Sequence, residues 1–177
     1  MPTNDKSSQA PGERELVITR VFDAPRKLVW KAFAESDRLA QWWGPTGFSM
    51  LTHTLDFRPG GIFHYSMRSP EGHISWGRFV YRDIQPPERM VFVNSFSDEE
   101  GNVTRAPFNP TWPLEVLNTL TLSEADGKTT LTLRGGPTNA TEEERETFWR
   151  AQESLRQGFA GTFDKLSDYL SGDLKGR

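Results

Sequence analysis

The residues that most often carry chemistry are few in this chain and stand apart from one another. The three histidines, His53, His64 and His73, occur singly, with no His-x-x-x-His or Glu-x-x-His spacing that would bring two ligands together. The chain has no cysteine, which excludes thiolate catalysis, disulfides and zinc–thiolate sites. No nucleophile stands in a recognisable pairing with a base. The sequence therefore predicts no metal site and no cofactor, and it leaves any catalytic residue unknown.

Other polar groups that suggest chemistry have simpler structural interpretations. His64 alternates away from an apolar strand face, so we interpret it as structural or exposed, with a general-base role as the alternative. The acidic run 142–144 follows Thr141, and Thr141 with Glu144 has the spacing of a helix capping box. Gly60-Gly61 is followed by neither a helix nor a Gly-Lys-Ser pattern, so it is no phosphate loop. The sequence describes a container more clearly than a reaction.

Composition narrows the range of partners. The chain has 177 residues, a usual length for one domain, and its 21 Lys plus Arg against 24 Asp plus Glu give a net charge of −3. No clustered basic face is visible, which argues against nucleic acid as a partner. No stretch approaches the roughly 18 consecutive apolar residues of a membrane span, and residues 1–13 lack the apolar segment of a signal peptide. We therefore expect a cytoplasmic protein without a membrane span.

Aromatic side chains are the unusual feature of the composition. They make up 12% of the chain, with six Trp and twelve Phe. Ligand pockets are lined mainly by apolar and aromatic side chains with few polar groups, but aromatics also fill ordinary cores. Phe63, Tyr65 and Met67 alternate with polar residues and so share one strand face. They form either a cavity wall, with the Tyr65 hydroxyl as a polar anchor, or plain core.

Neighbouring segments supply further candidates for a ligand-binding wall. Trp42 and Trp43 end a predicted short helix, where a packed corner is the alternative interpretation. The facing of several strand residues stays open, because a shift of one residue in register inverts it. The full set of candidate ligand-binding residues is Trp42, Trp43, Phe63, Tyr65, Met67, Trp76, Phe92, Phe96, Trp112, Leu155, Phe159 and Phe163.

The elements that must position these residues follow from periodicity and turn signals. Residues 1–13 are predicted to be a disordered tail, and residues 14–172 a single domain. A strand at 16–22 and two short helices precede a longer series of strands. Residues 97–113 show no periodicity and form a mobile loop or a lid. The later strands are predicted at 50–57, 62–68, 74–85, 89–96, 114–123 and 129–134, which favours a largely antiparallel sheet.

Residues 141–170 are predicted to form one long amphipathic helix across that sheet. Its apolar positions recur at spacings of three and four at Leu155, Phe159, Phe163, Leu166 and Leu170. Gly158 and Gly161 interrupt this segment, although each glycine costs about 1 kcal/mol of helix stability relative to alanine. Either the helix approaches the sheet closely at these glycines or they leave room for a ligand. The antiparallel sheet together with this long helix gives an α+β fold class.

Several short motifs, taken in their order and spacing, resemble one known family. They are Phe22-Asp23-Ala24-Pro25, Trp42-Trp43-Gly44-Pro45, Arg58-Pro59-Gly60-Gly61, Pro86-Pro87-Glu88-Arg89 and the segment 163–170. Over residues 14–171 the chain resembles the heat-shock-protein ATPase activator-like branch of the START-related (SRPBCC) superfamily. The resemblance implies a helix-grip fold, in which a bent sheet of about seven antiparallel strands wraps around a C-terminal helix. It also implies a hydrophobic cavity between sheet and helix.

Function varies among such relatives, which bind lipids or sterols, cyclise aromatic polyketides, confer resistance to toxic small molecules or assist a chaperone. Our first hypothesis is binding of a hydrophobic or aromatic small molecule, lipid-like or polyketide-like, in the cavity. The second is a cyclase-type enzyme, which needs a polar pocket residue with a shifted pKa. The third is a chaperone-associated module in a stress response, which needs an exposed apolar patch and little cavity. The sequence leaves open whether two copies of the chain form a homodimer.

Overall fold

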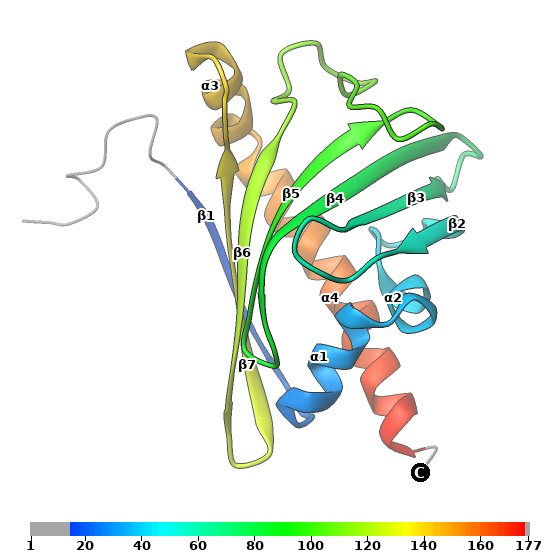
Figure 1. Ribbon diagram of the computed structural model, residues 1–177, viewed down its shortest axis with the longest axis vertical. Coiled ribbons are helices and arrows are strands. Elements are labelled where there is room, and N and C mark those ends of the chain that lie inside the picture. The colour runs from blue at the N-terminus through cyan, green and yellow to red at the C-terminus, as the bar shows by residue number, and fades with distance from the viewer. Residues whose placement is uncertain (1–14, 176–177) are drawn as a thin grey trace, which may run out of the picture.

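The structure is a computed structural model that describes residues 15–175; the tail predicted at residues 1–13 lies outside them. Within the described part, one seven-stranded sheet is accompanied by four helices (Figure 1). The strands are β1 (Leu16–Phe22), β2 (Ser49–Leu55), β3 (Ile62–Arg68), β4 (Ile74–Gln85), β5 (Arg89–Ser97), β6 (Val116–Ala125) and β7 (Lys128–Pro137). The helices are α1 (Arg26–Ala34), α2 (Ser36–Trp42), α3 (Glu142–Arg150) and α4 (Gln152–Lys175).

The sheet is antiparallel throughout, with the order β1-β7-β6-β5-β4-β3-β2. Strand β1 therefore lies beside β7, and helices α1 and α2 carry the chain from β1 at one edge to β2 at the other. Register shifts between Met50 and Thr52 and between Tyr81 and Asp83 mark β-bulges, which bend and twist their strands. The sheet is strongly curved, and α4 runs along its concave side (Figure 1). This is the α+β helix-grip fold that the sequence predicted.

Helix α4 buries the C-terminal half of its apolar stripe against the concave face. Phe163, Leu166 and Leu170 are at most 3% exposed, and the Phe163 ring meets the edge of the Phe22 ring at 6.1 Å. Helices α1 and α2 close the same end of the sheet and share this larger core cluster. Removing so much apolar surface from water is the main stabilising contribution to the fold.

A second, smaller core cluster lies at the other end of the sheet. Its buried residues are Leu16, Ala106, Trp112, Val116 and Phe148. Ile18 and Phe159 are only partly buried and pack against both clusters. Phe159 therefore marks the place along α4 where one core gives way to the other.

The prediction of a single helix over residues 141–170 is wrong, because the segment is divided at Ala151 into α3 and α4. The predicted capping box is present: Glu144 N–H donates to Thr141 Oγ1 at 3.1 Å, and Thr141 N–H donates to Glu144 Oε1 at 2.9 Å. At the break the Ala151 N–H is shared between the carbonyls of Thr147 and Phe148, which tightens the last turn of α3. The change of direction lets α3 pack on the smaller cluster while α4 stays on the concave face.

The two glycines of α4 have different surroundings, and neither of the two interpretations drawn from the sequence describes both. A Cβ at Gly161 would lie 2.4 Å from Thr46 Oγ1, so the close approach is to the loop after α2 and not to the sheet. A Cβ at Gly158 would have no atom within 4 Å. Neither glycine lines the cavity between α4 and the sheet, so they are no evidence for ligand space.

Candidate ligand-binding site

Alternate residues of the middle strands point from the concave face toward α4. The register pairs Tyr65 with Gly77 and Phe79 with Asn94, so these side chains lie next to one another on that face. Along α4, Leu155 and Phe159 are only partly buried, in contrast to Phe163. The N-terminal half of α4 therefore covers the sheet without filling the space beneath it.

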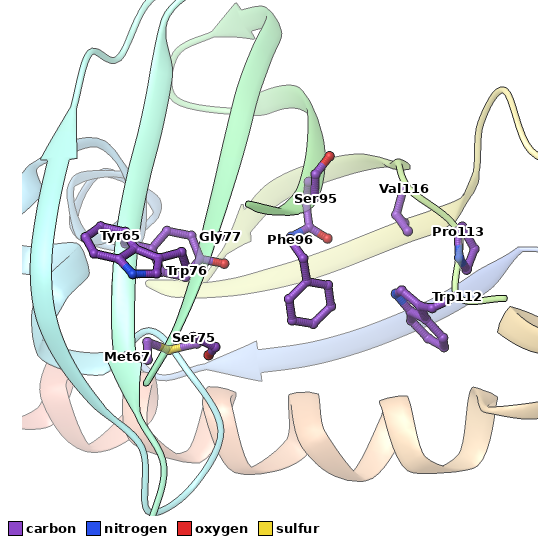
Figure 2. A pocket seen from close by; sticks show the side chains of 11 residues that line it. Tyr65, Met67, Ser75, Trp76, Gly77, Ser95, Phe96, Trp112, Pro113 and Val116 are labelled. Carbon is purple, nitrogen blue, oxygen red and sulfur yellow. The ribbon is translucent and has the colours of Figure 1, made fainter. Parts of the chain in front are cut away.

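The space beneath α4 is a cavity with three adjoining parts. The largest part has a volume of about 330 Å³ and lies between the first half of α4 and strands β5, β6 and β7. A second part of about 100 Å³ is bounded by β3, β4, β5 and the loop before β6 (Figure 2). A narrow third part of about 40 Å³ extends along α4 as far as Phe163. Asn94 lines all three parts, so each of them borders β5 at this residue.

The second part of the cavity ends at Tyr65. Figure 2 shows Tyr65 and Gly77 at one side, Trp112 at the other and the Phe96 ring between them. A Cβ on Gly77 would lie 2.6 Å from Tyr65 Oη, so glycine is needed there to make room for the hydroxyl. Burial raises the pKa of Tyr65 to about 12, which keeps the hydroxyl protonated at neutral pH.

The indole N–H of Trp43 faces the same hydroxyl and lowers the pKa of Tyr65 by a smaller amount than burial raises it. This N–H is buried and has no partner at hydrogen-bonding geometry among the described residues. The Trp43 ring packs on the edge of Phe79 at 5.1 Å and lines the narrow third part of the cavity. The Tyr65 hydroxyl thus adds polar character to an apolar space, while the Trp43 indole N–H is enclosed by protein atoms.

Ten of the twelve candidate residues border one of the three parts. The second part is bordered by Tyr65, Met67, Trp76, Phe96 and Trp112. The largest part is bordered by Phe96, Trp112, Leu155 and Phe159. The third part is bordered by Trp43, Phe92, Phe159 and Phe163. Trp42 and Phe63 border none of them. Both are fully buried, and the Trp42 indole donates to the Ala32 carbonyl at 3.0 Å. Trp42 and Phe63 are therefore core residues, which is the alternative that the sequence left open for both.

Trp76 borders the cavity in a different way from the other aromatic residues. The strand alternation places its side chain on the face opposite to Gly77, and its ring stacks on His64 at 5.0 Å. His64 Nε2 lies 3.1 Å from the Asp98 carbonyl oxygen. His64 is thus a structural residue on the convex side of the sheet, and the Trp76 ring packs there with it.

The loop over residues 98–115 covers one end of the cavity. Trp112 is 9% exposed and packs on Phe148 of α3 at 5.5 Å, whereas Phe108 is 65% exposed. Arg105 forms an ion pair with Glu144, and Thr111 Oγ1 lies 2.9 Å from Thr147 Oγ1. The backbone N–H of Thr141 and, next, the Arg105 guanidinium lower the pKa of Glu144. The segment predicted as a mobile loop or lid is thus attached to α3 by one ion pair and one hydrogen bond between hydroxyls.

An open groove continues outward from this covered end. It has a volume of about 840 Å³ and runs between Phe108 and Trp112 on the loop and the outer face of α3. Its α3 side carries Glu142, Glu143, Glu146 and Arg150. In contrast, no charged side chain of the described residues lines the three inner parts of the cavity. The arrangement is an apolar interior behind a largely acidic mouth.

Comparison with known proteins identifies the family. The family model for Activator of Hsp90 ATPase homolog 1-like protein matches residues 23–171, which is most of the chain. The chain belongs to this family. A comparison with curated proteins gave no match.

Several solved structures share the fold of this member of the Activator of Hsp90 ATPase homolog 1-like family. Protein Ms6760 from Mycobacterium smegmatis is 27% identical, with a TM-score of 0.72 over 88% of this chain and 90% of that one. A protein from Arthrobacter aurescens is 24% identical, with a TM-score of 0.74 over 93% and 90% of the two chains. A protein from Nitrosomonas europaea is 20% identical, with a TM-score of 0.73 over 91% and 96%. These likenesses support the fold and leave the ligand open.

Some cavity residues of this family member were missed from the sequence. Asn94 lies between Phe92 and Phe96 on β5, and Asn118 lies between Val116 and Leu120 on β6. The sequence did contain a signal for both residues, because each is polar at a position where the strand alternation predicts an inward-facing apolar residue. Phe108 and Phe148 carried no such signal, because their place at the cavity depends on how distant segments pack.

No group of three His, Cys, Asp or Glu side chains within residues 15–175 is arranged to hold a metal ion. None of the helices in this part of the chain is long and apolar enough to cross a membrane.

Proposed function

We propose that this family member binds a hydrophobic or aromatic small molecule in the cavity between α4 and the sheet. The observation that carries the proposal is the apolar space of about 330 Å³ under the first half of α4. That volume lies within the range of about 300–1,000 Å³ typical of ligand pockets, near its lower end. It suits a molecule of two or three rings better than a two-chain lipid.

The lining supports binding over a reaction that moves protons. The inner parts of the cavity contain no Asp, Glu, His or Lys among the described residues, and Tyr65 has a pKa of about 12. A general base needs a pKa near the working pH, which this tyrosine lacks. It can donate a hydrogen bond to a bound molecule, so the polar groups of the cavity are suited to orienting a ligand.

The exposed apolar residues give less support to a chaperone-associated surface. The large exposed hydrophobic side chains lie on several different strands and loops of the described part: Val21, Leu51, Ile62, Ile74, Phe108 and Leu114. Phe108 is the most exposed, and it stands at the mouth of the groove. Its exposure is better explained by ligand entry than by a separate docking patch.

The test fills the cavity and measures binding of a neutral hydrophobic dye, Nile red, by its fluorescence. Leu155→Trp places a large ring in the largest part, and Ser154→Phe fills the same part from a solvent-exposed position. Val21→Trp adds the same ring at a site that is 58% exposed and serves as the matched control. We expect both filling variants to weaken dye binding at least about tenfold, which corresponds to losing roughly 1.4 kcal/mol of binding energy.

Circular dichroism and thermal unfolding establish that each variant is folded before binding is compared. Loss of binding in Val21→Trp, or full binding in both folded filling variants, would show that the dye sits on the surface and would refute the proposal. Native mass spectrometry of protein taken directly from cells adds an independent readout, because a ligand held in the cavity is expected to appear as a discrete mass increment.

A further inference from the structure

A polar side chain lies at the centre of the cavity without a partner. Asn94 lines all three inner parts, and its carboxamide makes no hydrogen bond to any other residue in the described range 15–175. A carboxamide offers two N–H donors and a carbonyl acceptor. Asn94 is half-buried and borders the cavity space, so a molecule bound there can take up this unused hydrogen-bonding capacity.

A second carboxamide stands diagonally across from the first. Asn94 pairs with Val116 and Asn118 pairs with Phe92, which puts the two amides on the same concave face. Asn118 is 7% exposed, and its Nδ2 donates to the Val116 carbonyl at 3.2 Å. This bond uses one of the two N–H groups and fixes the orientation of the amide, and the carbonyl oxygen, Oδ1, is left without a hydrogen-bond partner among the described residues.

The glycine opposite Asn118 makes this orientation possible. Gly135 pairs with Asn118, and a Cβ there would lie 2.5 Å from Asn118 Oδ1. The close approach would forbid any larger residue at 135 while the amide keeps its place. The sheet therefore holds one acceptor at the wall of the largest part, beside the donor-and-acceptor amide of Asn94.

The charges around the cavity restrict the ligand further. An ion placed inside would lose its hydration with no opposite charge to replace it, because no charged side chain of the described residues lines the inner parts. At the mouth, Glu142, Glu143 and Glu146 outnumber Arg150, which also pairs with Glu146. Both regions disfavour a carboxylate.

Resting on the proposed function, we propose that the cavity selects an uncharged aromatic molecule bearing a hydroxyl or carbonyl group, which Asn94 and Asn118 bind. The aromatic walls cover the ring faces of the ligand, and the two amides fix its polar end at β5 and β6. Fatty acids and other carboxylates are rejected, although their apolar parts would fit. The specificity arises because a site with unmet hydrogen bonds discriminates against a molecule that cannot satisfy them.

Three probes of one ring system test the proposal by isothermal titration calorimetry at neutral pH: naphthalene, 2-naphthol and 2-naphthoate. We expect 2-naphthol to bind about tenfold more tightly than naphthalene, as one well-formed hydrogen bond to the half-buried amide of Asn94 allows. We expect 2-naphthoate to bind most weakly of the three. Tightest binding by 2-naphthoate, or equal binding of naphthalene and 2-naphthol, overturns the assignment.

Amide variants separate this inference from the proposed function. Asn94→Leu replaces the carboxamide by an apolar group of similar size, and should remove the preference for 2-naphthol while keeping naphthalene binding. Asn118→Leu should reduce the preference in part. Thr119→Val removes a hydroxyl from the opposite face of β6 and is expected to leave all three affinities unchanged.

The possible results distinguish failure of the amide contact from failure of the proposed cavity function. Unchanged preference in a folded Asn94→Leu variant, together with naphthalene binding that Leu155→Trp abolishes, refutes the amide contact and leaves the cavity function standing. Absence of binding by all three probes and by Nile red refutes both. Loss of naphthalene binding in Asn94→Leu, with the fold intact by circular dichroism, also counts against a role confined to the polar end of the ligand.

Discussion

Tyr65 belongs both to the core and to the cavity wall. Its ring is stacked on Phe63 at 4.7 Å and is 5% exposed, while its hydroxyl reaches across the neighbouring strand to the space above Gly77. The ring position is fixed by packing, because neighbouring aromatic rings surround it. The location of the hydroxyl therefore depends on the residue opposite, which must be glycine.

Gly77→Ala is expected to destabilise the protein by about 1–3 kcal/mol, as overpacking of a core does. The added Cβ would lie 2.6 Å from Tyr65 Oη and 2.8 Å from Tyr65 Cζ, and the ring has little freedom to move. Urea unfolding of the single variants and of Gly77→Ala/Tyr65→Phe measures the coupling. The double variant should recover part of the loss, because one of the two close contacts disappears; strictly additive changes would contradict the clash.

The raised pKa of Tyr65 makes stability depend on pH at the alkaline end. The hydroxyl ionises near pH 10 in the unfolded chain and near pH 12 in the folded protein. Its contribution is fully present below pH 10 and is lost as the pH rises toward 12, by roughly 2 kcal/mol. Urea unfolding over this interval should show a shallower decline for Tyr65→Phe. Some decline should remain, because burial also raises the pKa of Tyr81; identical slopes would contradict the assignment.

At the residue scale, the sequence predicted the aromatic walls better than the polar groups inside them. The alternation of Phe63, Tyr65 and Met67 gave their common face correctly, and Tyr65 and Met67 do border the cavity. Asn94 was overlooked because an isolated polar residue in a strand is usually solvent-exposed. The facing of Trp76 stayed open in the sequence, since the alternation of β4 could not be anchored without knowing its partner strands.

Helix α4 contains two glycines whose replacement should have opposite effects. Gly158→Ala is expected to stabilise the protein by about 1 kcal/mol, because the Cβ meets nothing and helix propensity rises. Gly161→Ala should destabilise it by about 1 kcal/mol, because the Cβ would press on Thr46 Oγ1. Thermal and urea unfolding measure both. In a Thr46→Ala background, Gly161→Ala should become stabilising; if it stays as harmful there, the contact with the loop is not the cause.

The link between the 98–115 loop and α3 should weaken in acid. The pKa of Glu144 is lowered by the Thr141 backbone N–H and by Arg105, so its stabilising effect is present above its ordinary value of 4.5 and is lost as the pH falls below it. Glu144→Gln can keep the capping box but loses the ion pair, and should lower stability at pH 7 by up to about 1 kcal/mol. Urea unfolding should show the difference vanishing in acid; a pH-independent difference would assign the effect to packing.

At the element scale, local signals predicted most of the fold. The strands at 16–22, 62–68 and 74–85 agree with the predicted bounds, and the capping box marks the start of α3. The break at Ala151 has no local signal, because neither glycine nor proline stands there. Its cause is distant in sequence: Phe148 packs on Trp112 at 5.5 Å, and this contact draws α3 away from the line of α4.

For the molecule as a whole, the cavity lies where two cores of unequal size meet. The larger cluster ties α1, α2 and the C-terminal half of α4 to the sheet, and the smaller one ties α3 and the loop to β1 and β6. Regions with fewer buried apolar contacts can open locally, at a lower free-energy cost than unfolding of the whole protein. A ligand between the clusters would add contacts mainly to the weaker side, where the loop and α3 form the entrance.

Hydrogen exchange followed by mass spectrometry should therefore show two levels of protection. Amides of α3 and of the first turns of α4 should exchange faster than those near Phe163, Leu166 and Leu170, which are buried in the larger cluster. Saturating 2-naphthol, at about 100 times its Kd, can stabilise the folded state by about 2.7 kcal/mol. The gain in protection should be greatest around Leu155 and Phe159 and on the 98–115 loop, because these segments border the largest part of the cavity. A uniform gain over all elements would indicate only global stabilisation, and a gain confined to the convex strand surfaces would place the ligand outside the cavity.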